Sequence, residues 1–114
     1  MIIIAFSDKT SKILPQIFCG NLKHCAPIEP TQDFLIMHQF ISHHNVTKIK
    51  LNSRDIKILQ AHGWRFVYLP QDLPRDLDTC DAMTCVQFCK YAIGMHNIFI
   101  QTPWALYRKI SEGM

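Results

Sequence analysis

The sequence predicts an α+β fold in which a small antiparallel sheet packs against a helix that carries a cysteine. Short apolar or alternating segments separated by polar turns are typical of antiparallel strands joined as hairpins. Later segments begin at residues that cap helices and continue with apolar residues at helical spacing. The chain has 114 residues, of which 48% are hydrophobic, and this size and composition predict a single domain over residues 1–114.

The first half of the chain contains the strands of an expected meander. Residues Met1–Phe6 form an apolar, β-branched run of the kind found in a central strand. Leu22–Ile28 and Phe34–Phe40 lie on either side of a polar turn centred near Thr31. Val46–Leu51 alternates apolar and basic residues and is expected to add a third strand to this meander.

A helix, a strand and a loop are expected next. Ser53 is a suitable N-cap for the helix, and Gly63 is suitably placed to end it. The alternation in Trp64–Leu69 predicts a half-buried strand. Residues 70–78 are rich in proline and aspartate and predict a long loop, and such loops often border functional sites.

The last part of the chain has clear helix start signals. Thr84 and Gln87 have the Thr-x-x-Gln spacing of a capping box, so we expect a helix that begins directly after Thr84 and ends at Gly94. Asn97–Ile100 is expected to form a short strand. The Thr-Pro pair at residues 102–103 then predicts the start of a final helix.

Cys85 is the cysteine with the best position for nucleophilic chemistry. It is the first residue of the expected helix, where unpaired backbone N–H groups and the helix dipole favour a thiolate and can hold an oxyanion. Cys89 lies one turn further along and is expected in the core, and Cys80 lies among acidic residues, which disfavour a thiolate. The alternative for Cys85 is a cysteine that only packs.

A nucleophilic cysteine needs a base, and the chain has six histidines. With the first hairpin centred as described, His24 lies opposite His38, and opposite residues project from the same face of a sheet. One imidazole would act as the base and the other would orient it, whereas Gln39 would point to the opposite face. The alternative is that each histidine is structural. His43 and His44 lie in a polar turn and are expected to be solvated.

The order of these residues resembles the circularly permuted papain-like group of cysteine hydrolases. That group includes NlpC-type amidases and peptidases and the relatives of lecithin retinol acyltransferase. The matching segments are Lys23–Ile28, Phe34–Phe40 and Thr84–Lys90, in the order histidine, polar residue, cysteine. The resemblance implies a small antiparallel sheet packed against the cysteine helix.

The resemblance also implies a function, which is that of a thiol hydrolase or acyltransferase acting on an amide or ester bond. Cys85 would be the nucleophile, His24 the base and His38 the orienting residue. A thioester on Cys85 would pass its acyl group to water or to another acceptor. The implied substrates are peptides, peptidoglycan stems or lipid acyl groups, and no cofactor or metal is implied.

Two other functions agree with the same residues. In a non-catalytic structural or partner-binding domain, the histidines would be structural and Cys85 would only fill space. In a zinc site, the ligands would come from one of two clusters. The first consists of Cys19, His24 and Cys25, and the second consists of Cys80, Cys85 and Cys89. Neither cluster has the tight paired spacing of a structural zinc site.

Charge and hydropathy restrict the partners that we expect. The net charge is +3, and the densest basic stretch contains Lys48, Lys50, Arg54 and Lys57. These residues alternate with apolar ones and fit the exposed face of a strand and helix, so we expect no nucleic-acid binding. The longest apolar stretch, Met1–Phe6, is far shorter than the ~20 residues of a membrane span and does not resemble a signal peptide. We expect a cytoplasmic protein, with phage association or non-classical export as the alternative.

Overall fold

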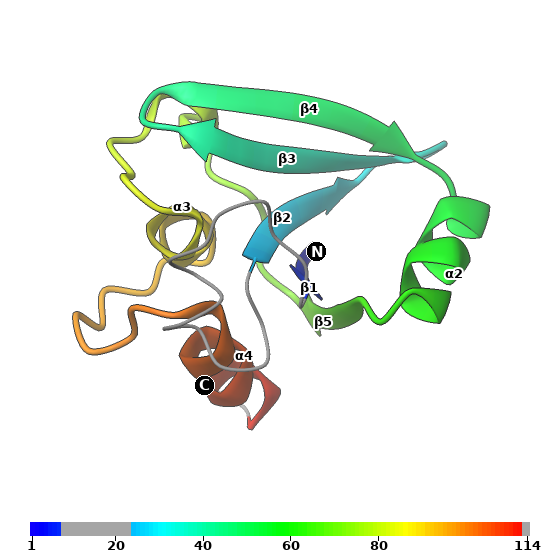
Figure 1. Cartoon of the computed structure of the whole chain (residues 1–114). Helices are drawn as coiled ribbons and strands as arrows, with labels where there is room; N and C mark the ends of the chain where they lie inside the picture. The colour runs from blue at the N-terminus through cyan, green and yellow to red at the C-terminus, as the bar shows by residue number, and fades with distance from the viewer. Residues whose placement is uncertain (8–23, 113–114) are drawn as a thin grey trace.

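The computed structural model describes residues 1–7 and 24–112 and has the predicted α+β fold (Figure 1). Its strands are β1 (Ile2–Ser7), β2 (His24–Pro30), β3 (Leu35–Ser42), β4 (Asn45–Leu51) and β5 (Arg65–Leu69). Its helices are α2 (Ser53–Ala61), α3 (Cys85–Ala92) and α4 (Pro103–Ser111), and a short 3-10 helix, η1 (Leu77–Thr79), precedes α3. The sheet is antiparallel throughout, with the strand order β4-β3-β2-β1-β5.

β1 is an internal strand, because it pairs with β2 on one side and with β5 on the other. Ile4 lies opposite Pro27 of β2 and Val67 of β5. Every residue of β1 is buried. This burial on both faces explains why the strand reads as a continuous apolar run instead of an alternating one.

Helices cover both faces of the sheet (Figure 1). α3 and α4 lie on one face, over Ile2, Ile4 and Phe6. α2 lies against the opposite face, where Ile3 and Ala5 of β1 belong to the other core cluster. α2 connects β4 to β5, which are the two edge strands, so the chain has to cross that face to reach its second edge.

The helix boundaries follow local signals in the sequence. Asn52, and not the predicted Ser53, is the N-cap of α2, since its side chain accepts the N–H of Asp55 at 3.0 Å and the Asp55 carboxylate accepts the N–H of Asn52 at 2.9 Å. Gly63 has a φ of +94° and Gly94 has a φ of +72°. Both glycines directly follow a helix end, as predicted, in the left-handed conformation that suits glycine.

The strand predicted at Asn97–Ile100 is wrong, because this segment forms a turn. The buried side chain of Lys90 in α3 explains the difference. Its Nζ donates hydrogen bonds to the carbonyl oxygens of Asn97 at 3.0 Å and of Ile100 at 2.7 Å. Ile98 and Phe99 are consequently exposed, by 72% and 87%.

The register of the first hairpin differs from the predicted one. Ile28 lies opposite Met37. In this register the residue opposite His38 is Pro27, and not His24. The turn that joins the strands is closed at Thr31, whose N–H donates to the Phe34 carbonyl at 2.7 Å. The predicted opposition of His24 and His38 is therefore wrong.

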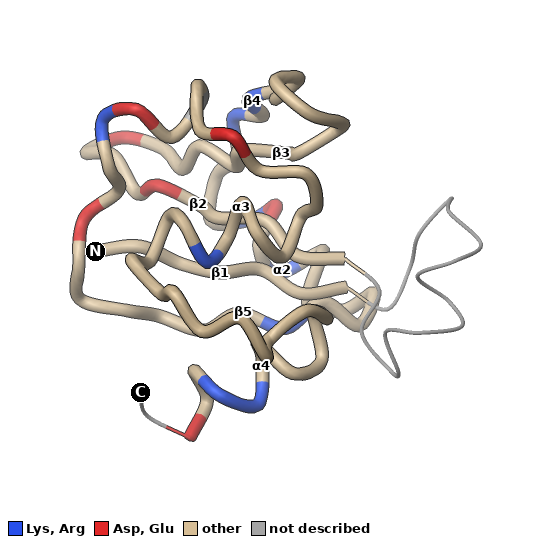
Figure 2. Tube along the Cα trace, turned by 90° about the vertical axis from the view of Figure 1, so that its left-hand side faces the viewer, with Lys and Arg blue, Asp and Glu red and all other residues tan. Residues whose placement is uncertain are grey.

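Charged residues are distributed unevenly over the elements of the fold. Lys and Arg residues lie on several separate elements, including β4, α3 and α4 (Figure 2). Acidic residues are concentrated in the segment between β5 and α3, which contains Asp72, Asp76, Asp78 and Asp81. Among the described residues, no helix combines the length and apolar character that a membrane span requires.

Candidate functional site

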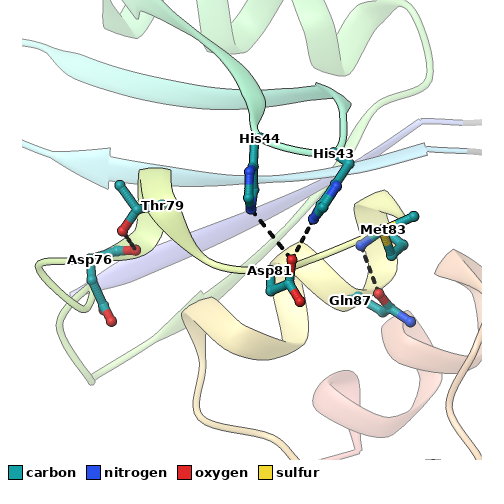
Figure 3. Close-up of polar contacts among 7 residues, drawn as sticks. All are labelled: His43, His44, Asp76, Thr79, Asp81, Met83 and Gln87. Carbon is teal, nitrogen blue, oxygen red and sulfur yellow. Dashed lines mark hydrogen bonds and ion pairs between the residues drawn. The ribbon is translucent and has the colours of Figure 1, made fainter.

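Cys85 is the first residue of α3, as predicted. Thr84 is the N-cap, and its hydroxyl oxygen accepts the backbone N–H of Gln87 at 3.1 Å. The Gln87 side chain accepts the N–H of Met83 at 2.7 Å, one residue before the expected donor (Figure 3). These two bonds fix the start of the helix and place Cys85 in a half-buried position at its N-terminal end.

Two consecutive residues at the start of β2 contact Cys85. α3 packs across β2, and the side chains of His24 and Cys25 both interact with the Cys85 thiol through hydrogen bonding and through charge. Cys25 is fully buried and also hydrogen-bonds with Cys89. The fold therefore brings together the residues that the sequence suggested as nucleophile and base.

The surroundings of Cys85 keep its thiol protonated. The hydrogen bond with Cys25 is the largest effect, followed by burial and by the charge of Cys25, and together they raise the pKa of the Cys85 thiol well above its ordinary value. His24 acts in the opposite direction through its hydrogen bond and its charge, but it does not reverse the shift. The neutral thiol is therefore the resting form, and not the thiolate expected from the helix N-terminus alone.

His38 lies on the face of the sheet that α3 covers. Along β3, Met37 belongs to the core cluster of the other face and Phe40 to the cluster beneath α3, so the alternation of the strand directs His38 toward α3. Its imidazole is buried, and its Nε2 lies 3.7 Å from Oε1 of Glu29. The role of His38 as an orienting residue stays a prediction.

The described residues contain one group of metal-ligand side chains, and it does not involve the cysteines. Cys19, a member of the first predicted zinc cluster, lies outside the described residues. Over residues 1–7 and 24–112, the group whose ligand atoms all lie within 4.8 Å of one another consists of His43, His44 and Asp81. The sequence predicts solvated turn residues at His43 and His44, and no local pattern pairs them with Asp81.

We compared the chain with protein-family models, with curated proteins and with solved structures, and none of these comparisons found a significant match.

Proposed function

We propose that this chain is a thiol hydrolase or acyltransferase that acts on an amide or ester bond, with Cys85 as the nucleophile and His24 as the base. The observation that carries the proposal is the interaction of the Cys85 thiol, at the N-terminus of α3, with the His24 imidazole at the start of β2. A nucleophile in contact with a base is the minimum arrangement for covalent acyl transfer. The reaction needs no cofactor.

The proton of Cys85 determines how the reaction starts. Because burial and Cys25 hold the thiol in its neutral form, the proton passes to His24 as the sulfur attacks the carbonyl carbon. The carbonyl oxygen becomes an oxyanion, which the N–H groups in the first turn of α3 can stabilise. His24 then gives the proton to the departing amine or alkoxide, and a thioester remains on Cys85. Water or another acceptor releases the acyl group.

The resemblance to the circularly permuted papain-like group supports the same reaction and suggests its substrates. In that group, a cysteine helix packs against a small antiparallel sheet and the base comes from a strand. Peptides, peptidoglycan stems and lipid acyl groups are the substrate classes that this resemblance implies. His38 as the orienting residue and a cytoplasmic location belong to the same proposal.

The raised pKa of Cys85 favours a second candidate, a non-catalytic structural or partner-binding domain of the same fold. Cys25 and Cys89 are fully buried, and free cysteines of this kind usually act as small apolar core residues. In such a domain, Cys85 would extend the buried thiol cluster and His24 would only complete its hydrogen bonding. The two candidates differ in whether His24 changes the reactivity of Cys85.

Site-specific alkylation of the cysteines tests the proposal. We expect iodoacetamide to label Cys85 faster than the buried Cys25 and Cys89 in the folded protein. The His24→Ala substitution should slow the labelling of Cys85 by roughly tenfold or more, because the base that accepts the proton is removed. Peptide mass spectrometry between pH 6 and pH 9 measures the rate for each cysteine separately.

Two matched controls separate catalysis from general exposure. His62 is an exposed histidine that follows α2, and the His62→Ala variant should leave the labelling of Cys85 unchanged. Cys80 is the other half-buried thiol. Incubation with an activated ester should produce an acyl adduct in the Cys80→Ala variant but not in the Cys85→Ala variant. Equal rates for Cys85 in the wild type and in His24→Ala, without an acyl adduct, would establish the non-catalytic candidate.

A further inference from the structure

A second cluster of reactive side chains lies at the tip of the β3–β4 hairpin, where His43 and His44 form the turn. Both imidazoles point toward Asp81, which lies in the loop before α3 (Figure 3). Nε2 of His43 hydrogen-bonds Oδ1 of Asp81, and Nε2 of His44 lies 3.4 Å from the same oxygen. The fold thus directs three side chains from two separate segments at one point in space.

The backbone of this turn contains one residue in the left-handed conformation. His44 has a φ of +59°, and it is the only described residue other than glycine with a positive φ. Residues with a Cβ atom adopt this left-handed conformation uncommonly, and asparagine, aspartate and histidine adopt it more often than the others.

The conformation of the turn brings the two imidazoles side by side. Their ring centroids are 3.9 Å apart with an interplanar angle of 34°. One histidine would be enough to form an ion pair with Asp81. A second imidazole directed at the same oxygen is therefore more than an ion pair requires, and it creates a set of ligands that converge on one point.

We propose that His43, His44 and Asp81 form a binding site for a divalent transition-metal ion, with Zn²⁺ as the expected occupant. Imidazole nitrogen and carboxylate oxygen are ordinary ligands of zinc, whereas Ca²⁺ and Mg²⁺ prefer sites made of oxygen atoms. Ligands bound about 2 Å from a tetrahedral zinc ion lie roughly 3.3 Å from each other. The 3.4 Å between His44 Nε2 and Asp81 Oδ1 agrees with this separation. His43 and Asp81 are hydrogen-bonded to each other directly, so this bond has to open for both side chains to bind the same ion.

The exposure of the site defines what the ion can do there. The side chains of His43, His44 and Asp81 are 41%, 59% and 87% exposed, so an ion reaches them directly from solvent. Three protein ligands leave at least one coordination position for water or for a donor group of another molecule. The bound ion also links the β3–β4 hairpin to the loop that leads into α3. The site does not depend on the chemistry of Cys85.

Metal titration of the full-length reduced protein tests this proposal. Because zinc also binds thiolates, Co²⁺ is used beside Zn²⁺, since cobalt bound to a thiolate shows a charge-transfer absorption that cobalt bound to imidazole and carboxylate lacks. We expect one ion per chain without that absorption, together with shifts of the His43 and His44 imidazole resonances in NMR spectra. Binding should also raise the melting temperature.

The variants are chosen so that they retain the fold. His44→Asn removes a ligand and introduces a residue that tolerates a positive φ, and Asp81→Asn keeps the size of the side chain. Each should weaken zinc binding by at least about tenfold, since even outer-shell residues of metal sites contribute 10–100-fold. His62→Asn, at an exposed histidine elsewhere, and Cys85→Ala should leave the affinity unchanged.

Three results would overturn the proposal. The first is an absence of zinc binding by the wild-type protein. The second is an unchanged affinity in both His44→Asn and Asp81→Asn. The third is a cobalt spectrum dominated by thiolate absorption that disappears in Cys85→Ala, which would place the ion at the cysteines.

Discussion

His24 and Cys25 are consecutive residues of β2, yet they act on the Cys85 thiol in opposite directions. The hydrogen bond and the charge of Cys25 raise the pKa of that thiol, whereas those of His24 lower it. Cys25 and burial together outweigh His24, so the Cys85 thiol stays neutral. Removing one neighbour or the other should therefore shift the reactivity of Cys85 in opposite senses.

The Cys25→Ala variant tests the contribution of Cys25. Loss of its hydrogen bond and its charge should lower the pKa of Cys85, and the thiolate fraction below that pKa increases roughly tenfold for each pKa unit. We expect iodoacetamide to label Cys85 at least several times faster than in the wild type at pH 8, as measured by peptide mass spectrometry. Cys89→Ala is the matched control, because Cys89 is equally buried. A rate for Cys85 that is the same in the wild type and in Cys25→Ala would contradict the dominant role of Cys25.

The position of Cys85 could be predicted from the sequence, whereas its neighbours could be identified only in part. The Thr-x-x-Gln pattern at Thr84 is a local signal, since the N-cap and the backbone N–H that it accepts are three residues apart. The contact with Cys25 depends on how α3 packs across β2, which no local pattern encodes. The proximity of His44 to Asp81 is equally non-local. The sequence shows two adjacent histidines in a turn, but it does not indicate that Asp81 lies beside them.

α3 connects the thiol cluster to the segment that leads to α4. Its N-terminal end carries Cys85, and its buried Lys90 donates hydrogen bonds to the carbonyl oxygens of Asn97 and Ile100. A buried lysine is tolerated because these acceptors replace part of its hydration. The residues between α3 and α4 are thereby held against the helix without forming a strand.

Substitution of Lys90 should destabilise the fold. Lys90→Met keeps much of the apolar stem but removes the donor, and the carbonyl of the buried Ile100 loses its partner. Hydrogen bonds to charged groups contribute about 1.5–3 kcal/mol, so we expect the free energy of unfolding to fall by about that amount in urea denaturation. Lys109→Met, on the exposed side of α4, should change it by no more than about 0.5 kcal/mol. Equal stabilities of the two variants would disprove a structural role of Lys90.

Among the elements, those bounded by local signals were predicted well. The capping threonines of α3 and α4 and the glycines after α2 and α3 lie where the sequence placed them. The register of the β2–β3 hairpin was wrong because the turn is closed between Thr31 and Phe34, which moves its centre toward the C-terminus. The short strand at Asn97–Ile100 was wrong because contacts from Lys90 outweighed the local β-propensity.

The two shifted thiols make the stability of the whole molecule depend on alkaline pH. An unperturbed cysteine ionises near pH 9.0, whereas hydrogen bonding with Cys25 and burial raise the pKa of Cys85, and burial raises that of Cys89. Above pH 9 the unfolded chain loses protons that the folded protein still holds. The stability that these thiols contribute is therefore fully present below about pH 9 and is lost as the pH rises further.

Urea denaturation between pH 7 and pH 10.5 checks this dependence. We expect the free energy of unfolding to fall above pH 9 by up to about 1.4 kcal/mol per pH unit for each of the two thiols. The decline should be much shallower in a Cys85→Ala/Cys89→Ala double variant. Tyr91, whose pKa is raised by its hydrogen bond with Asp76, titrates in both proteins and so cancels in the comparison. Parallel declines in both proteins would rule out the thiols as the cause.

The fold class was predicted from the sequence, but the order of the strands was not. The apolar run of β1 indicates burial on both faces, yet it does not specify which strands lie beside it. β5 reaches β1 only because α2 carries the chain from one edge of the sheet to the other. Pairing between distant strands depends on the packing of the entire core, and patterns within a single segment do not contain this information.

The position of β1 inside the sheet has a consequence for the kinetics of folding. The β2–β3 and β3–β4 hairpins join neighbouring segments, so they can form early and locally. β1 completes its hydrogen bonding only when Ile4 meets Val67, after a long stretch of chain has been closed into a loop. During synthesis, β1 therefore emerges before both of its partner strands and obtains its second partner, β5, late. Until then it is exposed to pairing with other chains, so aggregation should compete with folding mainly through β1.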